Sequence, residues 1–250
     1  MSDRERLARS FDAIVDRYDR GRFEYPAALV GAVVERLEIG PGRRVLDLAA
    51  GTGKLTRPLA ATGAELVAVD PGEALLARLR ETLPAVETRI GVAEAIPLPD
   101  ASVDAVTVGS AFHWFRIAAA LREIHRVLRE SGGLALLWNP IRLDDPVVAA
   151  VTQLIDPLWG DARPTNEPRQ WHRVLTRSGL FTAADEIELE ASEAVDAERL
   201  VDRILSISAV AAAPAERQTE VEAAVRRVAA EHAGTFEVRT RPFALVARRA

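Results

Sequence analysis

A short glycine-rich segment is the part of this sequence best suited to bind a ligand. The apolar run Arg44–Ala49 predicts a buried strand, and Gly51 and Gly53 follow it directly. Glycine permits a sharp backbone turn and lets a ligand approach where a Cβ would stand in the way. Asp47, near the end of the strand, can accept hydrogen bonds from a ligand ammonium group or fix the turn. Residues 47–54 are therefore a candidate binding loop.

A second carboxylate follows about twenty residues later, at the end of the next apolar run. The segment Glu65–Asp70 predicts a second strand, and Asp70 is its last residue. In α/β folds, an acidic residue at this distance from a glycine turn is placed to bind both hydroxyls of a ribose. The loop and Asp70 together favour a ligand that contains a nucleoside.

Three ligands and one purely structural role compete for the loop. A phosphate-binding P-loop requires Ser or Thr after its lysine, but Lys54 is followed by Leu55 and the earlier glycine position holds Leu48. An NAD site requires a third glycine, where Thr56 stands. S-adenosylmethionine has no phosphate, so fewer glycines suffice, and its amino group and sulfonium suit an acid at Asp47. The spacing favours S-adenosylmethionine and leaves NAD, or a turn that only packs well, as alternatives.

His113 is the leading candidate for a catalytic base. It follows the predicted strand Val103–Gly109, at the carboxyl edge where ligands bind in open α/β sheets. Its ordinary pKa suits proton transfer near neutrality. In the alternative interpretation, the cluster Phe112–Phe115 closes the floor of the site and His113 only hydrogen-bonds the backbone. The remaining histidines are expected to have packing or surface roles: His125, His172 and His232.

Composition limits the other partners. The 250 residues, 48% of them hydrophobic, can bury the core of one large α/β domain. A net charge of −5 argues against nucleic acid and anionic membrane as partners. The lack of cysteine excludes disulfides and thiolate sites, and no His, Asp or Glu spacing indicates a metal. The first ten residues are polar and no run of about twenty apolar residues occurs, so we expect a cytoplasmic protein.

Strand and helix patterns alternate through the first half of the chain, which indicates parallel βαβ units with right-handed crossovers. Amphipathic helices are expected over 3–20 and 27–37. Five strands are expected at 44–49, 65–70, 86–92, 103–109 and 134–138, with helices at 54–62, after Pro71, and from 117 to the pair Gly132-Gly133. Beyond Asn139 an insertion or cap over 140–167 precedes a helix at 168–178, a strand at 186–191, helices at 196–208 and 214–232, and one or two strands within 237–248.

A succession of short segments then resembles the class I S-adenosylmethionine-dependent methyltransferases. It is most similar to the small-molecule, type 11 group, which includes ubiquinone/menaquinone- and trans-aconitate-type enzymes. In family order the segments are Val45–Gly53, Val67–Pro71, Gly91–Glu94, Val106–Ser110, Ala111–Phe115, Glu123–Leu128 and Gly132-Gly133. The family often has glycine where Ala49 stands, and alanine is expected to cause only a minor adjustment.

The resemblance implies a Rossmann-like α/β fold. Its mostly parallel seven-stranded sheet has the order 3-2-1-4-5-7-6, with strand 7 antiparallel, helices on both faces and a small helical cap. Residues 1–250 would form a single methyltransferase domain, with 1–37 as an N-terminal helical lid. In such a domain Asp70 holds the ribose, Ala93 and Glu94 flank the adenine, Ser110 lines the methionine portion, and Tyr18 closes over the cofactor or simply packs. The complete predicted cofactor set is Tyr18, Asp47, Ala49, Gly51, Gly53, Asp70, Pro71, Ala93, Glu94 and Ser110.

The function implied is methyl transfer from S-adenosylmethionine to a small-molecule acceptor, with S-adenosylhomocysteine as the product and a monomer or homodimer as the assembly. Carbon, oxygen and nitrogen acceptors all stay open. Two alternatives also stay open at this point. The fold could bind S-adenosylmethionine but have lost methyl transfer, as a cyclase-type enzyme or a binding protein, or the chain could be an NAD-dependent oxidoreductase.

Overall fold

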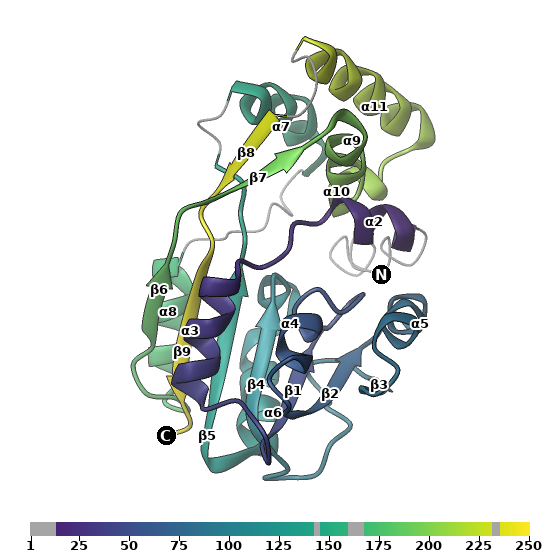
Figure 1. Ribbon diagram of the computed structural model, residues 1–250. Helices are drawn as coiled ribbons and strands as arrows, with labels where there is room; N and C mark the ends of the chain where they lie inside the picture. The colour runs from purple at the N-terminus through teal and green to yellow at the C-terminus, as the bar shows by residue number, and fades with distance from the viewer. Residues whose placement is uncertain (1–13, 143–145, 160–167, 232–235) are drawn as a thin grey trace. The chain divides into compact units, whose positions relative to one another are not determined.

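The computed structural model describes residues 14–142, 146–159, 168–231 and 236–250 (Figure 1). The chain divides into two compact units, each assembled from three separate segments. Glu24–Asn139, Thr165–Leu189 and Pro242–Ala250 form what we call the sheet unit. Met1–Phe23, Pro140–Pro164 and Glu190–Arg241 form the helical unit.

The sheet unit contains seven strands in the order β3-β2-β1-β4-β5-β9-β6. The first five pair in parallel, whereas β9 is antiparallel to both of its neighbours, β5 and β6. The predicted sheet and strand order are therefore confirmed, with β9 as the antiparallel strand. The bounds are β1 Arg44–Leu48, β2 Glu65–Asp70, β3 Glu87–Ile90, β4 Val103–Gly109, β5 Leu128–Trp138, β6 Asp185–Glu188 and β9 Phe243–Arg248.

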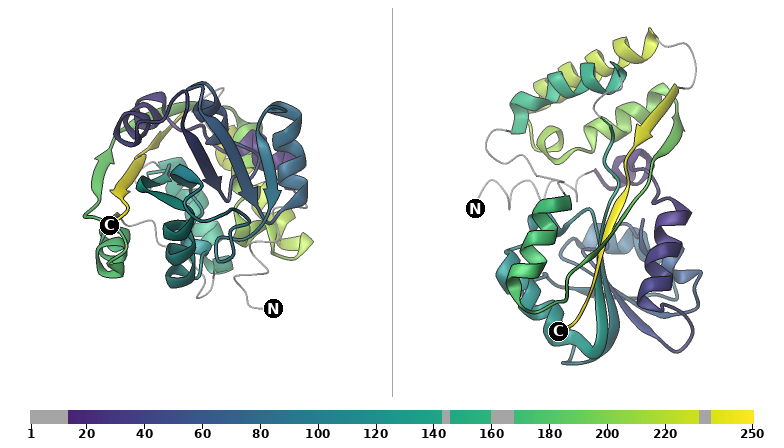
Figure 2. Two further views of the ribbon diagram at one scale, coloured as in Figure 1. Left: turned by 90° about the horizontal axis from the view of Figure 1, so that it is seen from below. Right: turned by 90° about the vertical axis from the view of Figure 1, so that its left-hand side faces the viewer.

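Alternating side chains of the central strands enter separate cores on the two faces of the sheet. Leu46 of β1 belongs to a core with α6 (Ile117–Val127) and α8 (Pro168–Ser178), whereas Val45 belongs to one with α3 (Ala27–Leu37). The right-hand view of Figure 2 shows α3 and α8 on opposite sides of the strands. Burial on both faces explains why these strands are almost continuously apolar. Helix α4 (Thr56–Ala60) shares the core that contains α3, and helix α5 (Glu73–Thr82) packs against Ala68 of β2 in a smaller core.

One predicted boundary in the sheet unit is wrong. Helix α6 ends at Val127 and β5 begins at Leu128, so Gly132 and Gly133 lie inside the strand instead of ending the helix. Gly133 is needed there because a Cβ would approach Leu37 Cδ2 at 2.5 Å and the Ala247 carbonyl oxygen at 3.0 Å. Close packing of neighbouring backbones, and not helix termination, accounts for this glycine.

Two further segments differ from their predicted bounds. The strand expected at 186–191 is two strands, because β6 ends at Glu188 and β7 (Ala191–Val195) belongs to a separate ribbon. The helix expected at 54–62 is limited to α4, since residues 51–55 are turns. A helix of five residues has only a weak dipole at its N-terminus.

The helical unit has its own hydrophobic core, built around Phe23, Val151, Leu200, Ile204 and Val225. Its helices are α2 Val15–Gly21, α7 Pro146–Trp159, α9 Ala197–Leu205, α10 Ser208–Ala211 and α11 Ala215–Ala230, and its ribbon pairs β7 with β8, Phe236–Thr240. Parts of two predicted segments, 3–20 and 140–167, lie outside the described residues. Among the described residues, no helix is long and apolar enough to cross a membrane.

Candidate functional site

The glycine turn after β1 contains three left-handed residues within five positions. Their φ angles are +59° at Ala49, +57° at Gly51 and +86° at Gly53. The amide of Ala49 donates to the Val69 carbonyl oxygen at 2.7 Å, which ties the turn to β2. The left-handed conformation costs alanine energy that glycine would not incur. This gives a physical reason for the glycine that the family resemblance leads us to expect at position 49, and it makes Ala49 a strained residue at the candidate site.

Asp70 connects the glycine turn to the turn that follows β2. One carboxylate oxygen accepts a hydrogen bond from the Gly51 amide at 2.9 Å, and the other accepts one from the Gly72 amide at 2.8 Å. The residue is buried. Each oxygen can accept more than one hydrogen bond, so the carboxylate can still receive ligand hydroxyls.

Asp47 is buried between β1 and its neighbours and receives two hydroxyl donors. Thr56 Oγ1 donates at 2.6 Å and Thr107 Oγ1 at 3.2 Å. Burial raises the pKa of Asp47 to about 7, the two threonine hydrogen bonds oppose the rise, and the charge of Asp70 adds to it. The sequence analysis missed both threonines. Thr107 lies directly opposite Asp47 in the β1–β4 register, so only the strand pairing could have revealed it.

An exposed apolar surface lies beside Asp70. Ile90 is 61% exposed and Val92 43%, and these two are the only exposed large hydrophobic side chains among the described residues. Ile90 pairs with Asp70 in the β2–β3 register. The next residues, Ala93 and Glu94, are less exposed, and a Glu94 oxygen accepts a hydrogen bond from the Arg116 amide at 2.6 Å, at the start of α6. A buried carboxylate beside an exposed apolar surface suits the ribose and base of a nucleoside.

Ser110 occupies a second strained position, directly after β4. Its φ is +53°, its amide donates to the Leu137 carbonyl oxygen at 2.7 Å, and its hydroxyl lies 2.9 Å from the Tyr25 hydroxyl. A Cβ at Gly109 would come within 2.8 Å of the same Tyr25 oxygen. Tyr25 is thus a site neighbour that the sequence alone did not reveal, because no local spacing links it to Ser110.

His113 lies in a short 3₁₀ helix, Phe112–Trp114, that follows β4. It is buried, and its ring centroid is 5.0 Å from that of Trp114. Phe112 packs edge-on against Trp171 at 5.3 Å, so this segment does form an aromatic layer. The role of His113 as a base stays a prediction.

The other described histidines have the expected packing contacts. His125 Nε2 accepts a hydrogen bond from Arg249 Nε at 3.2 Å, and His172 Nε2 lies 3.1 Å from the Ala184 carbonyl oxygen. His232 lies outside the described residues. Within the described ranges, no group of three or more His, Cys, Asp and Glu residues is placed to hold a metal ion.

The sheet unit contains all of the predicted site residues except one. Tyr18 belongs to α2 of the helical unit, where the guanidinium carbon of Arg22 lies 4.8 Å from the centre of its ring. Pro71, directly after Asp70, is exposed. The proposed contact of Tyr18 with the cofactor stays a prediction.

Comparisons with known proteins identify the family of this chain. The family described as "Methyltransferase domain" matches residues 46–136. An uncharacterized methyltransferase of Mycobacterium tuberculosis is 38% identical over 229 residues, which are 92% of this chain and 89% of the relative. An uncharacterized methyltransferase of Schizosaccharomyces pombe is 34% identical over 224 residues, or 87% of this chain and 86% of the relative. The chain belongs to the S-adenosylmethionine-dependent methyltransferases.

The methyltransferase is a class I enzyme of the type 11 group, as its motifs indicated. A solved structure assigned as a type II methyltransferase from Anaeromyxobacter dehalogenans is 29% identical, with a TM-score of 0.64, and covers 91% of this chain and 97% of the other. The match to the methyltransferase domain begins within β1 and includes β2, β3, β4 and the aromatic segment around His113. Nothing in the comparisons favours the NAD-dependent or the inactive alternative.

Proposed function

We propose that this methyltransferase binds S-adenosylmethionine at the glycine turn after β1 and methylates a small molecule, releasing S-adenosylhomocysteine. One observation carries the proposal. Two buried carboxylates, Asp47 and Asp70, meet the left-handed turn at the carboxyl ends of adjacent strands, beside the exposed Ile90. The carboxyl edge of a parallel sheet is where ligands bind in open α/β folds.

The chemistry of the donor set fits this cofactor. S-adenosylmethionine carries a sulfonium, an ammonium and one carboxylate, so it has a net positive charge that two acidic side chains attract. Asp70 would accept the ribose hydroxyls, and Ile90 and Val92 offer an apolar surface for the adenine. Ala93 and Glu94 would flank the base, with Ser110 near the methionine portion. When bound, the cofactor supplies a methyl group that is already activated for transfer.

The protein's own contribution is mainly to position the acceptor and to manage one proton. Holding the nucleophile in line with the methyl group lowers the barrier by replacing an encounter with a fixed geometry. A nucleophile that is protonated at neutral pH also needs a base. His113 would accept that proton, because it follows β4 at the same edge of the sheet as the glycine turn. The wider expectations of a cytoplasmic monomer or homodimer with no nucleic-acid partner belong to this proposal.

Calorimetry and methyl-label transfer test the proposal on the full chain. We expect S-adenosylhomocysteine to bind with micromolar or tighter affinity and NAD not to bind. Extracts of small metabolites supplied with methyl-labelled S-adenosylmethionine should yield a labelled product. Binding of NAD in place of S-adenosylhomocysteine would refute the proposal, and cofactor binding with no labelled product from any extract would favour a protein that has lost methyl transfer.

Replacing His113 with alanine tests the base. We expect turnover to fall by about 10²–10⁴-fold, the usual contribution of a general base, with little change in S-adenosylhomocysteine affinity. His125→Ala is the matched control, because His125 packs against Phe181 and accepts a hydrogen bond from Arg249. Turnover that is unchanged in His113→Ala would leave this residue a packing role only.

A further inference from the structure

Two arginines lie together in the helical unit, where helix α2 packs against helix α9. Arg22 directly follows α2 and Arg203 is in the last turn of α9. The two backbones are in close contact, because a Cβ added at Gly21 would collide with the backbone of Asp202 and Arg203. Gly21 therefore lets the two helices approach, and the charge of Arg22 acts on the Arg203 guanidinium.

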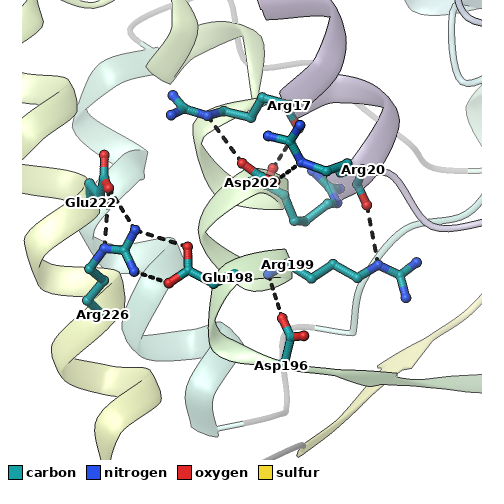
Figure 3. A network of polar contacts seen from close by, with 10 residues as sticks. Arg17, Arg20, Asp196, Glu198, Arg199, Asp202, Glu222 and Arg226 are labelled. Carbon is teal, nitrogen blue, oxygen red and sulfur yellow. Dashed lines mark hydrogen bonds and ion pairs between the residues drawn. The ribbon is translucent and has the colours of Figure 1, made fainter.

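Neighbouring arginines of the helical unit have carboxylate partners, and Figure 3 shows those of Arg17, Arg20 and Arg226. Asp202 forms ion pairs with Arg17 at 3.3 Å and Arg20 at 2.7 Å. Arg199 pairs with Glu193. On α11, Arg226 pairs with Glu198 and Glu222. Charge neutralisation is thus the rule in this part of the helical unit.

Arg22 and Arg203 are exceptions to that rule. Neither forms an ion pair with a carboxylate of the described residues, and Arg22 Nε and Arg203 Nη1 are buried with no hydrogen-bond partner among those residues. Among the described residues, the Arg22 side chain donates one hydrogen bond, from Nη2 to the Ser206 carbonyl oxygen at 3.3 Å. Burial, together with the charge of Arg22, lowers the pKa of Arg203 to about 9.

Aromatic rings hold both groups but do not satisfy their N–H donors. The Arg22 guanidinium carbon lies 4.8 Å from the centre of the Tyr18 ring, and that of Arg203 lies 5.9 Å from the centre of the Phe23 ring. Stacking of this kind orients the plane of a guanidinium and leaves its edge available for hydrogen bonds. Two cations that share a partly buried location without an anion are costly, and such arrangements are more frequent at functional sites than elsewhere.

We propose that Arg22 and Arg203 form a carboxylate-binding site in the helical unit. A carboxylate presents two oxygens in one plane, and arginine N–H groups bind such a pair with short, charge-assisted hydrogen bonds. This assignment rests on the proposed function: the carboxylate belongs to the methyl acceptor, which is then an organic acid. The same chemistry could come from the methionine carboxylate of the cofactor, so the experiment separates these two sources.

Thermal unfolding of the full chain in sodium succinate and in sodium citrate, against sodium chloride of equal ionic strength, tests the anion site. A ligand that binds only the folded state raises the unfolding temperature. We expect both carboxylates to raise it in the wild-type protein and to have no effect in Arg203→Met or Arg22→Met. Arg199→Met is the matched control, because Arg199 stacks on the same Phe23 ring at 5.5 Å but is paired with Glu193. It should keep the response to succinate and citrate.

The same variants distinguish an anion site from a purely structural stack in the absence of added anion. Arg203→Met removes an uncompensated charge and should raise the unfolding temperature by about 2–4 °C, whereas Arg199→Met removes an ion pair and should not raise it. An unfolding temperature of Arg203→Met below that of the wild type, together with a preserved response to succinate, would overturn the proposal. No response of the wild-type protein to either carboxylate, or a response to inorganic phosphate alone, would overturn it as well.

Calorimetry with S-adenosylhomocysteine identifies the source of the carboxylate. Unchanged affinity in Arg203→Met, with the succinate response lost, assigns the site to the acceptor. A loss of affinity of tenfold or more, absent for methylthioadenosine, which lacks the amino-acid portion, assigns it to the cofactor. Because wild-type S-adenosylhomocysteine binding is measured independently of the succinate response, failure of the proposed function and failure of the anion site give different results.

Discussion

Two buried aspartates of the central sheet strands have pKa values displaced in opposite directions. Among the described residues, Asp47 receives only the hydroxyls of Thr56 and Thr107, and its pKa is raised from 3.8 to about 7. Burial alone would also raise the pKa of Asp104 on β4, but the Arg44 amide at 2.8 Å and the Arg129 guanidinium at 2.7 Å lower it below its usual value. The two aspartates therefore differ in two ways: Asp47 is the more deeply buried, and only Asp104 accepts a hydrogen bond from a charged donor, Arg129.

The raised pKa of Asp47 predicts a pH-dependent effect of Asp47→Asn on stability. The folded protein keeps a proton that the unfolded chain releases between about pH 4 and pH 7, so the free energy of unfolding falls as pH rises through this interval. Asparagine removes that loss. We expect the free energy of unfolding of the variant, relative to that of the wild type, to increase by about 2–4 kcal/mol when the pH is raised from 5 to 8. Urea denaturation without cofactor measures both proteins at each pH.

Asp104→Asn is the control for this prediction. Its lowered pKa means that its stabilising effect is present above the unfolded value and is lost only as the pH falls through the lower folded value. The variant should therefore be less stable than the wild type by a similar amount at pH 5 and at pH 8. A gain from Asp47→Asn that is the same at both pH values would contradict the assignment of a raised pKa to Asp47.

At the scale of elements, strand β5 is the point where the parallel and antiparallel parts of the sheet meet. It pairs in parallel with β4 and antiparallel with β9, and Gly133 lies in both registers, opposite Ala105 and Arg248. Helix α3 packs over the same position through Leu37. The absence of a side chain at residue 133 lets the helix and the strand approach each other.

Gly133→Ala should therefore destabilise the sheet unit. The added Cβ would approach Leu37 Cδ2 at 2.5 Å and the Ala247 carbonyl oxygen at 3.0 Å, and overpacking of this kind costs about 1–3 kcal/mol. Gly31→Ala on α3 is the matched control, because a Cβ there meets nothing within 4 Å. This substitution also replaces a glycine inside a helix with a better helix former. It should stabilise by about 0.5–1 kcal/mol. Chemical denaturation measures both, and equal effects of the two substitutions would contradict the packing argument.

At the scale of the whole molecule, two cores are interleaved along one chain. The sheet unit is interrupted after Asn139 and again after Leu189, and its last strand, β9, follows the final segment of the helical unit. Each unit closes its own hydrophobic core from these separated segments. The proposed cofactor residues are concentrated in one unit and the proposed anion site lies in the other.

Hydrogen exchange with and without S-adenosylhomocysteine tests this division of roles. We expect slower exchange on binding in peptides that cover 46–53, 69–73, 90–95 and 109–114, because bound ligand suppresses local opening of the loops that contact it. Peptides from α11 should exchange at the same rate in both states. Protection that spares 46–53 would contradict the proposed cofactor site, whereas added protection over 15–22 would support Tyr18 as a lid.

Local spacing along the sequence was sufficient for much of this protein. The apolar runs that contain Asp47 and Asp70, and the glycines after the first run, predicted the central strands and the two carboxylates. This was possible because strand and helix periods and turn residues act over a few neighbouring positions. The strand order came from the family resemblance. The family resemblance, and not the local pattern, predicted that the last strand of the sheet, β9, is antiparallel.

Only the tertiary structure decided which distant residues meet. Thr107 reaches Asp47 through strand register, Tyr25 reaches Ser110 across 85 positions, and Gly133 is a packing residue and not a helix end. Arg22 and Arg203 become neighbours because α2 packs against α9 at Gly21. Such contacts depend on the register and packing of elements far apart in the chain, and no local periodicity carries that information.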